Sequence, residues 1–535
     1  MKFLSALDAL FLHLETPEQP MHVGGLNTLK LPDRYKGDFY KDVVEHFASR
    51  LHFAPLFRRK LATMPLGVSN PAWTIDKDLD LAWHIQKVKL PKPGGMKQLN
   101  AFVAKAHAEL LTRDRPLWRA YVIEGLADGQ AAFYAKFHHA ALDGQGGVAL
   151  AKAILDLEAK PLRGTASDSA RGVSQSSNRI ASRATSKKPQ GKPSTGAMLA
   201  ASFRGLLGQY AALVRAAPKI TNSVSDVISQ RLKGGDPKTV ASTLDGLITG
   251  LKGGYLGTVK GLVGPKTRMN VAISDKRAFA TLSLPLHEVK RIGKAAGGSL
   301  NDAVLAIVSG GLRSFLESHG ELPKKSLICA MPVSLRSEPH QGPGEIENQS
   351  SMVLTTLASD IANPLKRLQA IIEGTQRAKQ LSSAMKSGMP TDIPSLGIPW
   401  LMTGLTKLYT ATKIANHLPP IANVVVSNVP GPPIALFMAG AQLSSYYPVS
   451  IVVHGIALNI TLQSYHGQLY FGLIACAKAV PDVAKLAIFL ESAFQELKVH
   501  FENEMSSEPE TPILTPKPRV KRKAPPKKPA TLAHA

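Results

Sequence analysis

Cysteine is almost absent from this chain of 535 residues, because only Cys329 and Cys476 occur. The two are far apart in the sequence and match no zinc-binding or redox spacing, so we expect no metal site. Scarce cysteine is typical of proteins that work in a reducing compartment.

Long apolar runs are also missing. No uninterrupted stretch of about 18 apolar residues occurs, so we expect no membrane-spanning helix. The N-terminal MKFLSALDALFLHL has some features of a signal peptide, but Asp8 and His13 interrupt it and no small-residue cleavage site follows. We interpret it as the start of the first domain.

Several catalytic and nucleotide-binding motifs do not occur in the sequence. There is no Gly-x-Ser-x-Gly elbow, no phosphate-binding Gly-x-x-x-x-Gly-Lys-Ser/Thr loop, and no Gly-x-Gly-x-x-Gly after a predicted strand. No short-period repeat occurs either. These absences argue against serine hydrolases with that elbow, P-loop and dinucleotide-binding enzymes, and repeat proteins.

Acidic residues are scarce relative to basic ones, 39 against 64, which gives a formal net charge of +25. Such an excess suits an anionic partner. It is concentrated in 163–197, with seven Lys/Arg and one Asp, and in 516–530, with seven Lys/Arg and no acid. Both segments are poor in apolar residues and are predicted to be disordered. They act either as solubilising linker and tail or as contacts to an anionic membrane. No nucleic-acid-binding motif accompanies the charge, so no nucleic acid partner is expected.

What the sequence does contain is a mixture of helix and strand patterns, with 44 % hydrophobic residues. In the first part, residues 118–126 and 131–139 read as strands of a hairpin joined by the turn ADGQ. In the second part, Ser299 and Asp302 form a capping-box pattern before a long helix. The interspersed elements predict an α/β or α+β fold with mixed sheets layered by helices. The remaining predicted helices are 40–57, 99–116, 148–159, 286–298 and 480–501, and the remaining strands lie within 278–286, 326–336, 423–433 and 450–477.

Breaks in composition divide the chain into segments. We predict an N-terminal domain over 1–160 and a disordered basic insert over 161–197. A helical crossover follows over 198–265, then a second domain over 266–500 and a disordered basic tail over 501–535. The crossover begins with an amphipathic helix that either packs on the protein or lies on a membrane surface.

The stretch KFHHAALDGQGG places His138, His139, Asp143 and Gly144 close together. Successive strand side chains point to opposite faces, so the two histidines cannot both face one cavity if the strand persists. One imidazole can then act as a general base while the other is fixed in the scaffold. Asp143 either anchors the loop through an arginine elsewhere or orients the imidazole directly. Metal binding is disfavoured because no third ligand stands at helical spacing.

HHAALDG matches the His-His-x-x-x-Asp-Gly signature of the CoA-dependent acyltransferase superfamily. Further stretches follow in order: LSALDALFLHLETPEQPMHVGGL, RPLW, SLNDAVLA, MPVSLR and SNVPGPP. Together they resemble the bacterial wax ester synthase/acyl-CoA:diacylglycerol acyltransferase family over about 1–160 and 266–500. The basic insert and the tail lie outside this resemblance.

The resemblance implies two chloramphenicol-acetyltransferase-like lobes with mixed sheets and a tunnel between them. It implies His139 as the general base, which takes a proton from an alcohol that attacks the thioester of a fatty acyl-CoA. His138 is expected to support it, and Asp143 and Gly144 to be structural, with Arg336 as the partner of Asp143.

Other residues receive roles from the same resemblance. Asn301, Asp302 and Asn428 are candidates for the lining of the substrate tunnel, and N-capping of a helix is the competing role for Asp302. Trp118, in RPLW, is expected to belong to the core of the first lobe.

The implied activity is transfer of a fatty acyl group to diacylglycerol, to a long-chain alcohol, or to both, with acyl-CoA as substrate and no cofactor. The expected location is cytoplasmic, at the inner membrane or at lipid inclusions, where an anionic surface is available. Rival interpretations are an inactive lipid-binding or scaffold protein of the same fold, and a basic nucleic-acid-binding protein. The intact signature argues against the first, and charge alone supports the second.

Overall fold

The computed structural model describes residues 2–62, 70–142, 150, 154–159, 263–334, 350–385, 413–416 and 418–506. The basic insert, all but the last residues of the predicted crossover, and 507–535 of the tail lie outside these residues. Five of the twelve residues of the helix predicted over 148–159 also lie outside them.

The first sheet has seven strands within the described residues, in the order β12-β13-β2-β7-β6-β5, with β14 paired to β2. The pair β5–β6 is parallel and the other pairs are antiparallel, so the sheet is mixed. The predicted hairpin is confirmed as β6 and β7. The strands are β2 (His22–Lys30), β5 (Ile85–Lys89), β6 (Trp118–Glu124), β7 (Ala131–His138), β12 (Phe437–Met438), β13 (Ala441–Leu443) and β14 (Tyr447–Val449).

The second sheet has six strands in the order β10-β9-β11-β15-β16-β8. It is also mixed, because β11 runs parallel to both β9 and β15 while the other pairs are antiparallel. The predicted class of mixed sheets layered by helices is confirmed. The strands are β8 (Arg277–Pro285), β9 (Ile328–Ser334), β10 (Ser350–Thr356), β11 (Val424–Val429), β15 (Leu458–Tyr465) and β16 (Gln468–Cys476).

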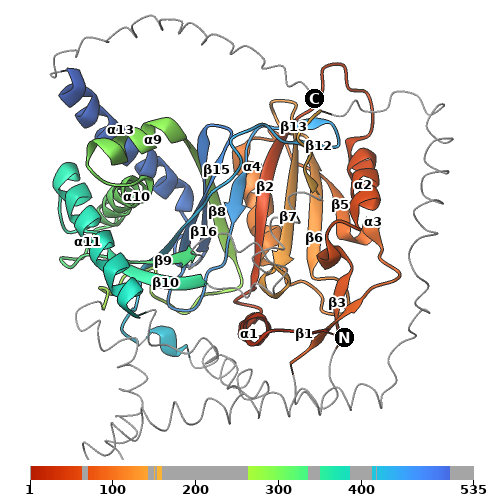
Figure 1. Cartoon of the computed structure of the whole chain (residues 1–535), viewed down its shortest axis with the longest axis horizontal. Helices are drawn as coiled ribbons and strands as arrows, with labels where there is room; N and C mark the ends of the chain where they lie inside the picture. Colours follow the sequence, from red (N-terminus) through yellow and green to blue (C-terminus); the bar gives the residue numbers. More distant parts are fainter. Residues whose placement is uncertain are drawn as a thin grey trace, which may run out of the picture.

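Helices form the outer layers and fill the space between the two sheets (Figure 1). Four helices pack on one face of the second sheet around a large apolar core. Helix α2 covers the outer face of the first sheet, and α4 lies between the sheets. The helices are α1 (Ala6–Leu14), α2 (Phe39–Arg50), α3 (Leu81–His84), α4 (Met96–Ala108), α9 (Leu286–Ala295), α10 (Leu300–Glu317), α11 (Pro364–Met385) and α13 (Val483–Ser506). None of these helices is long and apolar enough to cross a bilayer.

Smaller elements complete the described chain. A three-stranded sheet has the order β1-β4-β3, and η1, η3 and η6 are short 3-10 helices. Their bounds are β1 (Lys2–Phe3), β3 (Arg59–Ala62), β4 (Ala72–Ile75), η1 (Pro55–Phe57), η3 (His139–Ala141) and η6 (Ile414–Asn416).

Strands of the second half complete the sheet of the first half. Strands β13 and β14 both pair with β2, so the predicted range 266–500 contributes strands to both sheets. Helix α13 continues to Ser506, past the predicted boundary at residue 500. The two halves are therefore joined through backbone hydrogen bonds as well as through the apolar cluster around α4.

Two glycines in the stretch MHVGG let neighbouring groups lie close to β2, Gly24 on the side of β7 and Gly25 against Tyr446 of the second half. A Cβ on Gly24 would lie 2.4 Å from the carbonyl oxygen of Ala135, and one on Gly25 would lie 3.0 Å from the ring of Tyr446. Distances near 3 Å or less are too short for carbon contacts, so only glycine lets β2 lie this close to its neighbours.

Candidate active site

The histidine pair lies where β7 ends. The strand finishes at His138, and His139 begins the 3-10 turn η3. The backbone N–H of His139 donates to the carbonyl of Met21 at 2.8 Å. His138 is 1 % exposed, whereas His139 is partly exposed. The two imidazoles therefore have different environments. The predicted strand over 131–139 ends one residue early, so the difference comes from the 3-10 turn that begins at His139 and not from the alternation of strand side chains.

Both ring nitrogens of His138 have polar neighbours, and Nδ1 is the one that forms a hydrogen bond. Its Nδ1 accepts a hydrogen bond from the backbone N–H of Ala140 at 3.1 Å, so in the neutral ring the proton is on Nε2. That Nε2 lies 3.2 Å from Oε1 of Glu15. A buried histidine whose Nδ1 is hydrogen-bonded and whose Nε2 faces a buried carboxylate is suited to a supporting role rather than to proton exchange with a substrate.

His139 is free of such partners. Its ring stacks on Phe11 of α1, with centroids 3.9 Å apart and planes at 19°. Within the described residues its buried Nδ1 has no hydrogen bond to another residue. Burial lowers the pKa of His139 to about 4. A hydrogen bond with the backbone of His139 acts to raise this pKa, and the charge of His138 acts to lower it further. The imidazole is therefore neutral near pH 7 and able to accept a proton.

Glu15 is a site residue that the sequence analysis missed. Its side chain is 3 % exposed and lies between His138 and Arg113. Burial raises the pKa of the Glu15 carboxyl, but His138 and Arg113 outweigh burial and hold the pKa below its ordinary value. The only sequence signal was a carboxylate just after an apolar helix, and its partners lie about 100 residues or more away.

A buried polar network lies beside this site. His107 of α4 accepts at Nδ1 from the hydroxyl of Tyr134 at 2.7 Å and donates from Nε2 to the carbonyl of Ser450 at 2.8 Å. His22 donates to the carbonyl of His107 at 2.5 Å. Lys136 donates to carbonyls at the end of α4, and burial lowers its pKa to about 7. The network fixes α4 to both halves of the protein.

Two of the predicted tunnel residues lie together. The side chain of Asn428, at the end of β11, donates to Oδ1 of Asn301 at 2.7 Å. Asp302 instead forms the capping box of α10, since its Oδ2 accepts from both the backbone N–H and the hydroxyl of Ser299. Its Oδ1 accepts from Thr375 at 2.6 Å. The alternative role of Asp302 as a helix cap is therefore confirmed.

Asp143 and Gly144, the last two residues of the signature, lie outside the described residues. The predicted partner of Asp143, Arg336, lies outside them as well. Trp118 is fully buried in the core of the first sheet, where its indole donates to the carbonyl of Phe57 at 3.1 Å. The expectation that Trp118 is a core residue is confirmed.

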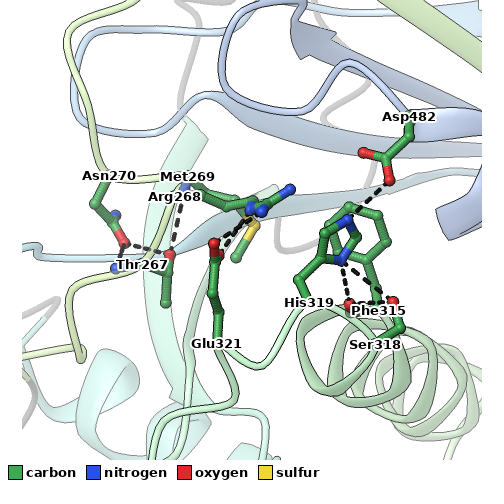
Figure 2. Close-up of polar contacts among 9 residues, drawn as sticks. All are labelled: Thr267, Arg268, Met269, Asn270, Phe315, Ser318, His319, Glu321 and Asp482. Atoms are coloured by element: carbon green, nitrogen blue, oxygen red, sulfur yellow. Dashed lines mark hydrogen bonds and ion pairs between the residues drawn. The ribbon is translucent and has the colours of Figure 1, made fainter.

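A second histidine–carboxylate pair lies at the C-terminal end of α10 (Figure 2). His319 Nε2 lies 3.0 Å from Asp482, and its Nδ1 lies 2.7 Å from the carbonyl of Phe315. Nearby, Arg268 pairs with Glu321 at 2.7 Å. Both nitrogens of His319 are held by these contacts, which tie the ring to the last turn of α10 and to Asp482. This cluster fastens the end of α10.

The chain matches two family models. The wax ester synthase/diacylglycerol acyltransferase catalytic domain matches residues 4–304, and the WS/DGAT C-terminal domain matches residues 346–498. The first match contains the histidine pair and Glu15, and the second contains Asn428.

Individual proteins are similar over nearly the whole chain. A Mycobacterium tuberculosis protein with the provisional name diacylglycerol O-acyltransferase is 33 % identical over 495 residues, 92 % of this chain and 99 % of the relative. The O-acyltransferase WSD of Acinetobacter baylyi is 31 % identical over 498 residues, 92 % of this chain and 96 % of the relative. The solved structure of a wax ester synthase/diacylglycerol acyltransferase from Marinobacter aquaeolei VT8 superposes with a TM-score of 0.62 at 27 % identity, covering 94 % and 99 % of the two chains.

Proposed function

The chain belongs to the wax ester synthase/diacylglycerol acyltransferase family, and from this premise we propose that His139 is the general base of its acyl transfer. The protein is an O-acyltransferase that moves a fatty acyl group from acyl-CoA to diacylglycerol, a long-chain alcohol, or both. Membership confirms the predicted family and activity. The role of single residues rests on the geometry of the histidine pair.

The observation that carries the proposal is the difference between the two histidines. His138 accepts a hydrogen bond at Nδ1 and faces the carboxylate of Glu15 with Nε2, whereas the buried Nδ1 of His139 has no hydrogen bond to another described residue and its imidazole is neutral. Only the second ring can accept a proton without first breaking a hydrogen bond to the protein.

The reaction then needs one base and no covalent enzyme intermediate. His139 takes the hydroxyl proton as the alcohol oxygen bonds to the thioester carbonyl carbon of acyl-CoA. The tetrahedral intermediate collapses, the carbon–sulfur bond breaks, and the imidazolium returns its proton to the leaving thiolate. General base catalysis supplies about 10²–10⁴-fold. A base with a pKa near 4 is weak, so orientation of the two substrates must supply a large part of the remaining acceleration.

We propose that Asn301 and Asn428 line the path of one substrate. They support this role because their amides lie side by side, partly accessible, between α10 and the end of β11. Asp143 and Gly144 complete the proposed active-site loop, with Arg336 as the anchor of Asp143, and these three assignments rest on the family signature alone.

The proposed place of action is a lipid surface. The acceptors are lipids, none of the described helices can span a bilayer, and two segments rich in Lys/Arg flank the second half of the chain. Association of these segments with anionic lipid would bring the enzyme to its acceptor. This proposal depends on charge and on the chemistry of the substrates.

A thiol-release assay tests the function. Purified protein is incubated with palmitoyl-CoA and either diolein or hexadecanol, and release of CoA is followed together with product formation. We expect turnover by the wild type and less than about 10 % of it by His139→Ala, given the usual size of general base catalysis. No turnover with any acceptor would favour the inactive scaffold. A His139→Ala protein with most of the wild-type rate would exclude His139 as the base.

A further inference from the structure

Behind the histidine pair lies a buried carboxylate whose contacts all lead to His139. We propose that Glu15 is a positioning residue for His139. Its carboxylate holds the backbone of the base in place and also holds the helix whose aromatic ring stacks on the base. The inference rests on the proposed function, because it assigns Glu15 a role only through His139. Glu15 does not touch the imidazole of His139 itself.

The first link runs through Met21. Oε1 of Glu15 accepts from the backbone N–H of Met21 at 3.2 Å. The carbonyl of the same residue accepts from the backbone N–H of His139 at 2.8 Å. The carboxylate therefore fixes the peptide to which the main chain of the base is bound.

The second link runs through His138. With Oε1 of Glu15 facing Nε2 of His138 at 3.2 Å, the ring proton is held on Nε2. Nδ1 is then free to accept from the N–H of Ala140 at 3.1 Å. This hydrogen bond fixes the turn directly after His139. The carboxylate thus sets the tautomer that the turn requires.

The third link runs through Arg113 and α1. Arg113 donates to Oε2 of Glu15 at 3.0 Å and to the carbonyl of Leu12 at 2.8 Å. Glu15 is also the residue that ends α1. This helix carries Phe11, whose ring stacks on the imidazole of His139. One carboxylate therefore controls the backbone on both sides of the base and the helix that supplies its stacking partner.

A neutral amide cannot replace this carboxylate. Two N–H groups, from Met21 and Arg113, donate to the two oxygens of Glu15, and Nε2 of His138 lies 3.2 Å from one of them. Glutamine offers one acceptor oxygen and an NH₂ group that would face a donor. We expect Glu15→Gln to release at least one of these three groups, most directly the ring of His138.

The loop itself should remain folded in this variant. Thr16 and Gln19 form a backbone bridge, the side chain of Gln19 accepts from the backbone N–H of His454 at 2.9 Å, and Arg277 donates to the carbonyl of Glu18 at 2.5 Å. These contacts do not involve the carboxylate of Glu15. Its loss should therefore disturb the position of His139 more than the stability of the protein.

The test compares Glu15→Gln with Glu18→Gln, a matched change in the same loop that leaves the backbone contact of Glu18 intact. For Glu15→Gln we expect kcat to fall on the order of 10²-fold, the usual effect of a misplaced catalytic group, with KM for palmitoyl-CoA within about threefold of the wild type. Glu18→Gln should keep the wild-type kcat. Glu15→Asp, which retains the charge, should recover part of the loss, and it decides the question if Glu15→Gln does not fold.

A second arm separates positioning from general damage. Glu15→Gln is placed in the His139→Ala background, where a residue that acts only through His139 should cause no further loss. Either of two results would overturn the inference. The first is a wild-type kcat in Glu15→Gln, or in Glu15→Asp if Glu15→Gln does not fold. The second is the same fractional loss of kcat in both backgrounds. Failure of the proposed function is distinguishable, because it appears as wild-type turnover by the single His139→Ala variant.

Discussion

Asn428 donates a hydrogen bond to Asn301 at 2.7 Å, and this contact joins the end of β11 to the first turn of α10. The two residues are 127 positions apart in the sequence, and each was predicted separately to line the substrate path. A partly accessible amide pair is a poor source of stability, because water competes for both partners. Its place at the meeting of two elements is the basis of the proposal that the pair contacts a substrate.

We predict that Asn301→Ala and Asn428→Ala each lower kcat/KM by about tenfold, the equivalent of one hydrogen bond to substrate. The free energy of unfolding should change by less than about 1.5 kcal/mol. Activity with palmitoyl-CoA and chemical denaturation measure the two quantities. Asn363→Ala, which removes an exposed amide contact at the start of α11, is the matched control and should leave activity unchanged. Equal kcat/KM in all three variants would argue against a role in substrate binding.

The depressed pKa of His139 predicts an unusual pH profile. A base with a pKa of about 4 stays neutral well below the ordinary histidine value of about 6.5. We therefore expect kcat/KM to show no acidic limb near pH 6.5 and to decline only as the pH approaches about 4. An initial-rate series over this range measures it, and a limb centred near 6.5 would contradict the assignment.

Acid unfolding must be separated from this titration. Burial lowers the pKa of His84 to about 4 and that of His107 to about 3. The unfolded chain therefore binds more protons than the folded chain below about pH 6.5. The stability contributed by these neutral histidines is present above that value and declines as the pH falls toward about 4 and below. Activity measured after return to neutral pH reveals any irreversible loss.

Asp143 and Arg336 form a predicted ion pair that is directly testable. We expect Asp143→Asn and Arg336→Gln each to lower the melting temperature, and the double variant to lose less than the sum, because residues in one pair are energetically coupled. The charge-reversed pair Asp143→Arg/Arg336→Asp should recover part of the loss. Strict additivity of the single effects, with no recovery on reversal, would exclude the pairing.

The basic tail should bind anionic lipid. Near such a surface each Lys or Arg contributes about 1 kcal/mol, and 516–530 carries seven of them without an acid. We predict that full-length protein floats with anionic vesicles at low salt and is released by added salt. Deleting 516–530, or replacing its seven basic residues by glutamine, should weaken flotation with little change in activity on soluble acceptors. Binding that is indifferent to salt and to both changes would leave the tail a solubilising role only.

Much of the fold could be predicted from local patterns. Two strand-like apolar runs on either side of ADGQ predicted the hairpin of β6 and β7, and the spacing of Ser299 and Asp302 predicted the cap of α10. These features depend on residues a few positions apart, whose geometry the local backbone fixes. The different environments of His138 and His139 were expected from strand alternation, but they arise because the strand ends at His138 and a 3-10 turn begins at His139.

The partners of these elements were not predictable from local patterns. The sequence placed 437–449 in the second half, whereas β13 and β14 pair with β2 of the first sheet. A short strand carries the same residue pattern whichever sheet it joins. Its choice depends on the space left open by the packed helices and on glycines that let backbones approach.

The sequence by itself determined the family signature, the candidate base, the excess of positive charge and most helices and strands. The tertiary structure alone decided that Glu15 faces His138, that Arg113 ties this carboxylate to α1, and that Asn301 meets Asn428. The physical reason is that such contacts join segments about 100 or more residues apart. They arise from the packing of the whole chain, and no periodicity in the sequence encodes them.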